Sequence, residues 1–342
     1  MTEQQNNQSK NRFTTLSFWF KSILILSIIW LIYEFLKQGR VELPQLLNRL
    51  RSADVTWIGI GVLMSGLFIF FQGEMYVWSF RSVQENVPRW TAIRLYLKRN
   101  FVSVFLPAGA VSSLATFSQS IENKGITKFK ISVASVIYII SGVVTLWLIA
   151  VPILIYTARL QQIDKAASIS LGVLTGLLLL VIVSVLSIKN KGTMYEFFAK
   201  RFPKIALQID DFLHAPINIK ALITTNIASL ILEIVGIFLL FVSIYAIGLD
   251  INWIVPFLAY TLSTLILYVA PIARGVGAVE LSLIYVLTHN GIDANSALTV
   301  TLIYRFFGFW LPVLLGGVVF INKKSFLQKP YSTNNLLKKL AH

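Results

Sequence analysis

The sequence contains no cysteine and only three histidines, which lie far apart at His214, His289 and His342. The absence of cysteine excludes disulfides, thiolate metal sites and cysteine nucleophiles. The scattered histidines argue against a histidine metal centre and against a Ser-His-Asp triad. We therefore expect neither a metal nor a cofactor, and the sequence offers no catalytic residue.

Charged residues are also scarce, at 13% of the 342 residues, whereas 56% are hydrophobic. The mean hydropathy of +0.72 and several apolar runs of 18 or more residues indicate an all-α, polytopic membrane protein. A net charge of +15 would suggest nucleic acid as the partner of a soluble protein. Here the cations lie between apolar segments, which points instead to membrane lipids, in particular anionic ones.

The apolar segments predict a domain order of a cytoplasmic tail (1–17), a transmembrane domain (18–321) and a basic cytoplasmic tail (322–342). Two shorter apolar segments, 253–270 and 278–288, flank a break. Alternating polar and apolar residues at 90–99 suit an amphipathic helix at the membrane interface. About six full spans are expected, at 18–36, 55–80, 131–156, 166–188, 221–247 and 297–321.

The break at 270–280 holds Pro271, Gly275 and Gly277 together with two opposite charges, Arg274 and Glu280. Proline and glycine interrupt a helix, and charges inside a membrane usually mark a functional site. Broken backbone at membrane depth must be buried in protein or line a wet cavity. The alternative is a tight loop at the membrane surface with a snorkelling arginine.

A second break lies at Pro107 and Gly109, followed by Ser112 and Ser113, where the flanking apolar pieces are too short to span. Both breaks suit re-entrant hairpins. The same spacings recur after each break, which predicts an internal repeat. The matching positions are Gly125, Tyr138 and Gly142 in the first copy and Gly291, Tyr304 and Gly308 in the second.

Three full spans would separate the two copies, so the repeat should be inverted. On this topology most of the 30 Lys and Arg residues fall on the cytoplasmic side, as the positive-inside rule requires. Both termini should then be cytoplasmic in a multi-pass protein of the cell membrane. Interrupted segments in inverted halves are typical of a transport site near the midplane.

The segment 271–280, then Gly291, Tyr304-Arg305 and the end of the last span at 309–312, resembles the lysylphosphatidylglycerol synthase transmembrane region, also called the flippase-like domain. The resemblance extends over roughly residues 15–322. Pro107-Ala108-Gly109 resembles the family's earlier Pro-x-x-Gly-Glu motif.

Two departures from the family pattern matter. Ala273-Arg274 replace the usual glycine, and Val111, Ser112 and Ser113 stand where an acidic residue usually follows. The soluble aminoacyl-transferase domain of the full-length enzymes does not follow before His342. The resemblance therefore implies lipid translocation rather than lysyl transfer.

Each candidate residue has a functional and a structural interpretation. Arg274 and Arg305 could hold a phosphate headgroup at the Gly275–Gly277 turn, because a guanidinium grips phosphate with two parallel hydrogen bonds. Alternatively, Glu280 and Arg305 form a structural pair. The buried acids Glu233 and Glu74 could carry a proton or serve as static partners of the arginines. Ser112 and Ser113 could bind the headgroup or cap the broken helix.

The sequence thus favours a transporter that moves a lipid or lipid-linked headgroup between leaflets. The alternatives are an integral membrane transferase acting on a lipid phosphate, or a scaffold for a separate lipid-modifying enzyme. A transferase should carry an acidic metal-binding cluster such as Asp-x-Asp. The sequence contains only the adjacent pair Asp210-Asp211, on a polar connector.

Overall fold

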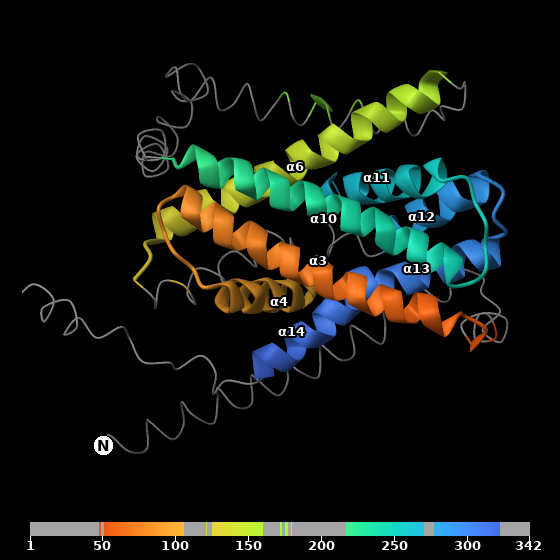
Figure 1. The fold of residues 1–342 in the computed structure, drawn as a ribbon, viewed down its shortest axis with the longest axis horizontal. Helices are drawn as coiled ribbons and strands as arrows, with labels where there is room; N and C mark the ends of the chain where they lie inside the picture. Colours follow the sequence, from red (N-terminus) through yellow and green to blue (C-terminus); the bar gives the residue numbers. More distant parts are fainter. Residues whose placement is uncertain are drawn as a thin grey trace, which may run out of the picture. The chain divides into compact units, whose positions relative to one another are not determined.

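A computed structural model describes residues 51–105, 125–159, 217–269 and 277–321, with a few single positions outside these ranges. The chain divides into two units, Met1–Ser52 and Ala53–His342, and every helix below belongs to the second. Throughout the described ranges the regular structure is helical, as expected (Figure 1). The elements are α3 (Val55–Ser82), α4 (Arg89–Phe105), α6 (Lys128–Arg159), α10 (Ile219–Tyr245), α11 (Ile254–Val269), α12 (Ala278–His289), α13 (Ala294–Arg305), the π-helical turn η2 (Phe306–Trp310) and α14 (Leu311–Ile321).

Helices α3 and α10 form the central pair of the bundle and run antiparallel (Figure 1). A backbone hydrogen bond joins them at each end. The amide of Asp54 donates to the carbonyl of Ala246 at 2.8 Å, and that of Asn218 donates to the carbonyl of Ser82 at 2.9 Å. Asp54 and Asn218 also cap their own helices through their side chains. The start of each helix is thereby fixed against the end of the other.

Two groups of helices pack on this pair. One hydrophobic cluster joins α3, α4 and α6 around Tyr76 and Phe80, and another joins α10, α11, α12 and α13 around Leu240 and Leu283. Helix α14 crosses α4, where a Cβ at Gly316 would lie 2.2 Å from the carbonyl oxygen of Leu97. Close approach of the two backbones therefore requires glycine at this crossing.

Four helical stretches in the described ranges are long and apolar enough to cross a membrane: Val55–Ser82, Phe129–Ile153, Ile219–Tyr245 and Ala294–Phe320. They correspond to four of the six expected spans. The range 18–36 and most of 166–188 lie outside the described residues. Helices α11 and α12 are shorter, and the break at 270–276 between them also lies outside the described residues.

Helix α4 begins where the amphipathic helix was expected and continues to Phe105. One side of it is buried against α3 and α14 and carries Ala92, Leu95 and Tyr96, while Trp90 is exposed. Helix α4 is thus half enclosed by the bundle rather than lying only against a surface.

Candidate functional site

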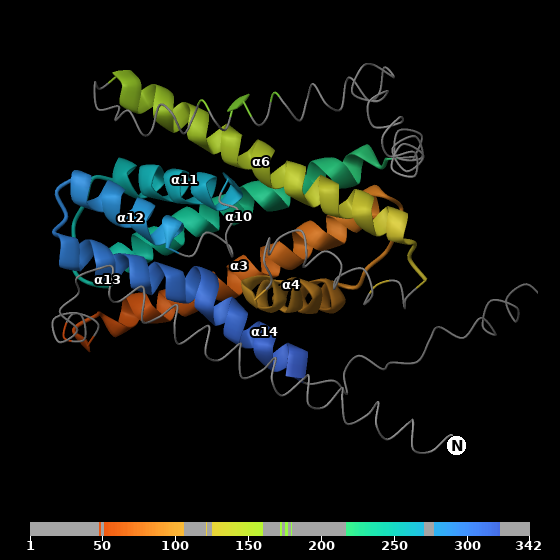
Figure 2. The same ribbon diagram turned by 180° about the vertical axis from the view of Figure 1, so that it is seen from behind.

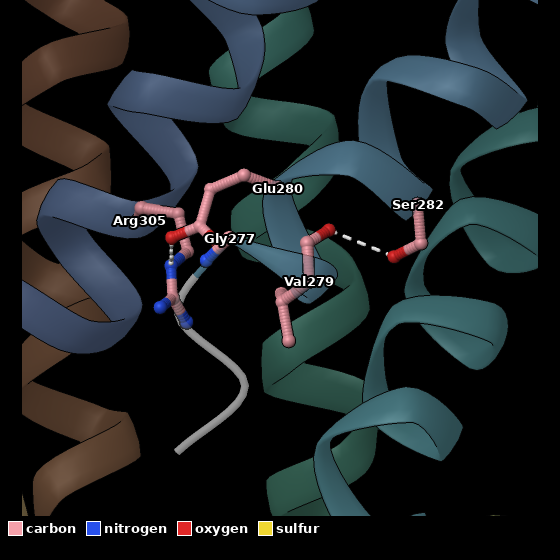
Figure 3. Close-up of polar contacts among 5 residues, drawn as sticks. All are labelled: Gly277, Val279, Glu280, Ser282 and Arg305. Atoms are coloured by element: carbon pink, nitrogen blue, oxygen red, sulfur yellow. Dashed lines mark hydrogen bonds and ion pairs between the residues drawn. The ribbon is translucent and has the colours of Figure 1, made fainter. Parts of the chain in front are cut away.

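The centre of the candidate site is a buried ion pair between Glu280, in the first turn of α12, and Arg305, the last residue of α13 (Figure 3). The Nε atom of Arg305 donates to Oε1 of Glu280 at 2.6 Å. Arg305 is 6% exposed and Glu280 is 4% exposed. The pair therefore links α12 to α13 in the interior of the bundle, where each charge compensates the other.

The start of α12 uses the second oxygen of the same carboxylate. The amide of Gly277 donates to Oε2 of Glu280 at 2.7 Å, so Glu280 both caps the helix and holds Arg305. Gly277 has a φ of +89°, in the left-handed region that favours glycine. In the next turn the hydroxyl of Ser282 donates to the carbonyl of Val279 (Figure 3). The turn expected from Gly277 thus aims Glu280 back at the end of α13.

The guanidinium of Arg305 has donors that Glu280 does not satisfy. Its Cζ lies 4.2 Å from the centre of the Phe309 ring, in a cation–π contact. Its Nη2 is buried and has no hydrogen-bond partner among the residues that the structure describes. In Figure 3 the two terminal nitrogens point away from Glu280. Buried donors are almost always paired, so Nη2 marks a place where an acceptor is expected.

Arg305 is followed directly by the π-helical turn Phe306–Trp310. Such turns inside α-helices are rare and frequently lie at functional sites. The turn carries Phe309 beneath the guanidinium and Phe307 against α3, where Ser65 donates to the carbonyl of Phe307 at 2.7 Å. The sequence gives no signal for this turn, because its register depends on these tertiary contacts.

A second buried acid, Glu233 on α10, lies near this pair. It is 3% exposed, and the hydroxyl of Tyr260 on α11 donates to its Oε2 at 2.7 Å. The phenol of Tyr304, next to Arg305 in sequence, lies within electrostatic reach of the same carboxyl. The sequence left open whether Glu233 partners an arginine or carries a proton, and in the structure its hydrogen-bond partner is Tyr260.

Gly236 makes room for this tyrosine, since a Cβ there would lie 2.4 Å from the Tyr260 ring. We expect Gly236→Ala to displace Tyr260 from Glu233 and to lower the free energy of unfolding by about 1–3 kcal/mol, the usual effect of overpacking. Denaturant unfolding in detergent measures this. Gly66→Ala is the control, because its Cβ would meet nothing within 4 Å. Equal stability of the two variants would contradict the packing.

Glu74, the third candidate acid, has a different environment. It is buried on α3, where Oε1 lies 2.6 Å from Nε of Arg89 and Oε2 accepts from Nε1 of Trp78 at 3.2 Å. Arg89 is 63% exposed and belongs to the start of α4. Glu74 therefore joins α3 to α4 and does not meet Arg305.

A further polar cluster lies between α3, α4 and α6 and was missed from the sequence. Arg99 of α4 is buried and donates to the hydroxyl of Tyr76, and its Cζ lies 5.6 Å from the Tyr138 ring. Tyr138 stacks on Tyr76 and donates to Gln72. Both side-chain polar atoms of the neighbouring Asn100 are buried without a partner in the described part of the chain. The sequence analysis named one residue of this cluster, Tyr138, as a position of the predicted repeat.

Several expected site residues lie outside the described residues, and the structure does not place them. They are Pro107, Gly109, Ser112, Ser113, Pro271, Arg274 and Gly275. Of the expected headgroup site, the structure places Gly277 and Arg305, and both contact the expected acidic partner Glu280. Within the described ranges no group of three or more His, Asp or Glu residues is placed to hold a metal ion.

Long apolar helices that enclose an ion pair and a further carboxyl define an integral, multi-pass membrane protein with a polar interior. The sequence comparison agrees with this class. Residues 18–316 match the pattern of the family described as the lysylphosphatidylglycerol synthase TM region, and the chain belongs to that family. A comparison with curated proteins finds no matching sequence.

Proposed function

We propose that this protein is a translocase that moves an anionic phospholipid, or a related lipid-linked anionic headgroup, between the leaflets of the cell membrane. The observation that carries the proposal is the buried Nη2 of Arg305, which lacks an acceptor among the described residues. A phosphate oxygen is the acceptor that suits a guanidinium best. Membership of a family related to lipid handling supports a lipid as the source of that phosphate.

The start of α12 favours the same ligand. The first amides of a helix have no intrahelical partners and attract anions, and Gly277 begins this helix beside Arg305. A phosphate arriving here would compete with Glu280 for the guanidinium. The Glu280–Arg305 pair would be formed in the absence of lipid and would open when the phosphate binds. Arg274 and Gly275, just before Gly277 in sequence, are proposed to complete the headgroup contacts.

The proposal includes an inverted repeat with two re-entrant segments, and three observations support it. Gly125 and Gly291 have nearly the same φ, +83° and +90°. Tyr138 faces Gln72 on α3, as Tyr304 lies near Glu233 on α10. Corresponding helices also run in opposite directions: α3 against α10, and α6 against the run from α13 to α14 (Figure 2). Opposite direction is what an inverted repeat requires.

Translocation can be measured with the purified protein in phosphatidylcholine liposomes that contain a trace of fluorescent phosphatidylglycerol or fluorescent phosphatidylcholine. We expect the protein to speed the exchange of the anionic probe between leaflets over that in protein-free liposomes, because only the anionic headgroup lacks a neutralising charge of its own. Equal rates with and without protein for the anionic probe would contradict the proposed function. Equal acceleration of both probes would contradict recognition of the anion.

The proposed topology predicts opposite exposure of the two turns. Cysteine at Gly125 or Gly291 would be strained by the positive φ, so the exposed neighbours Thr127 and Ala294 are better positions. Because the chain has no native cysteine, each single variant carries one thiol. We expect an impermeant maleimide to label Thr127→Cys from the cytoplasmic face and Ala294→Cys from the outer face. Labelling of both from one face would contradict the inverted repeat.

A further inference from the structure

The buried charges between α10 and α13 do not balance in the described part of the structure. This region holds two carboxyl groups, Glu233 and Glu280, and one guanidinium, Arg305. Both oxygens of Glu280 are engaged, one by Arg305 and one by the amide of Gly277. Glu233 has no cationic partner among the described residues and accepts from a neutral hydroxyl, that of Tyr260. An ionised carboxylate in this position would be an isolated buried charge, which is costly.

The groups that face Glu233 from the neighbouring helices are neutral. Tyr260 faces it from α11 and Tyr304 from α13. On the α3 and α6 side, the phenol of Tyr138 is hydrogen-bonded to Gln72. The side chains from α3 and α6 that pack around the adjacent Leu232 are Phe68, Phe71, Met75 and Tyr138. Tyr304 lies within electrostatic reach of both Glu233 and Arg305, and so connects Glu233 to the Glu280–Arg305 pair.

An anionic headgroup at Arg305 would increase the imbalance. The headgroup would add a negative charge to a region that holds one cation and two acids. A proton on Glu233 removes one negative charge, so protonation and anion binding favour each other. Coupling of this kind is reciprocal: if the proton strengthens binding of the anion, the anion strengthens binding of the proton by the same factor.

We propose that Glu233 is a proton-binding site that couples the movement of the anionic lipid to the movement of a proton. This inference rests on the proposed function. The proton adds to a carboxylate oxygen of Glu233 from water on one side and leaves to water on the other, and no covalent bond of the lipid changes. A lipid with one negative charge then crosses together with one proton, so that no net charge is moved.

The test uses the liposome assay with fluorescent phosphatidylglycerol at a series of pH values. For the wild-type protein we expect the rate of translocation to fall by about tenfold per pH unit on the alkaline side, as for any step that requires one bound proton. Glu233→Gln mimics the protonated acid in shape and charge. Its rate should be independent of pH over the same range.

Two further variants serve as controls for Glu233→Gln. Glu74→Gln alters a buried acid that is already paired with Arg89, and it should keep the wild-type pH dependence. Glu233→Asp retains a carboxyl and should remain pH-dependent. A wild-type pH dependence in Glu233→Gln would overturn the inference, as would pH-independent translocation by the wild-type protein.

A second measurement needs no variant and keeps the inference testable if Glu233→Gln does not fold. A pH-sensitive dye inside the liposomes reports whether protons move with the lipid. We expect the internal pH to change when the anionic probe is driven across, and no change with fluorescent phosphatidylcholine. Lipid movement without a pH change would overturn the coupling and leave the translocase standing. Failure of the wild-type protein to move the anionic probe at any pH would overturn both.

Discussion

Glu280→Ala is expected to lower the free energy of unfolding by about 3–5 kcal/mol, the usual effect of removing one partner of a buried ion pair. The loss is large because Arg305 would keep its charge in the interior of the bundle without the carboxylate that accepts from its Nε. The start of α12 would also lose the acceptor of the Gly277 amide. Denaturant unfolding of the purified protein in detergent measures the change, and lipid translocation should be lost with the fold.

Glu74→Ala provides the matched control. Glu74 is a buried acid too, but its partner Arg89 is 63% exposed and can return to water. We expect this variant to lose no more than about 1 kcal/mol, as is usual for pairs with an exposed partner. A double variant, Glu280→Ala with Arg305→Met, should recover much of the stability, because no buried charge is then left unpaired. If Glu280→Ala were as stable as the wild-type protein, the pair could not have the structural role described here.

Arg274→Ala should weaken lipid binding without lowering the stability of the protein. Arg274 lies three residues before Gly277, in the break that precedes α12, and we assign it to the headgroup rather than to the fold. Loss of one charge-assisted contact should weaken lipid binding by about 1.5–3 kcal/mol. In affinity this corresponds to roughly a tenfold to hundredfold loss. Thermal stability and expression should be retained, while translocation in liposomes should fall.

Arg305→Ala should differ from Arg274→Ala, because we assign Arg305 both a structural and a headgroup-binding role. It would remove the proposed headgroup contact and also strand Glu280, so both stability and translocation should be lost. Normal translocation by a well-folded Arg274→Ala protein would contradict the headgroup assignment of Arg274. A variant that fails to fold would show that Arg274 has a structural partner instead.

The helices could be predicted from the sequence because long apolar runs leave few alternatives. The expected span 221–247 is observed as Ile219–Tyr245, and the expected segment 278–288 as Ala278–His289. Asp54, Asn218 and Asp293 end the polar segments before three helices and cap them. Capping and hydropathy depend on residues that are close in sequence, so they predict these helices without knowledge of the tertiary contacts.

The Glu280–Arg305 pair could be named from the sequence because few charges fall within apolar segments. What the sequence could not give is the geometry around the pair. That Glu280 also accepts from Gly277 depends on the turn into α12, and that Arg305 stacks on Phe309 depends on the π-helical turn. Both features follow from how α13 packs against α12 and how η2 packs against α3, which no local pattern encodes.

The burial of Arg99 could not be predicted from the neighbouring residues in the sequence. It lies with Arg94 and Lys98 in a basic stretch that is typical of a membrane surface. The structure buries it instead between Tyr76 and Tyr138, which come from different helices. A cationic side chain in an amphipathic stretch has no local property that distinguishes a solvated position from one covered by two other helices. The burial of Arg99 depends on how α3, α4 and α6 pack together, which the charge pattern does not encode.

We propose that an anionic headgroup binds beside Arg305 at the start of α12. The most direct measurement is photo-crosslinking in liposomes with a phosphatidylglycerol that carries a photoreactive group beside its phosphate, followed by mass spectrometry of the labelled peptides. We expect adducts at the start of α12 and on the segment from Arg305 to Trp310, and competition by unlabelled phosphatidylglycerol but not by phosphatidylcholine. Adducts confined to exposed apolar side chains of α10 such as Ile223 and Phe238, unaffected by either competitor, would contradict binding at this site.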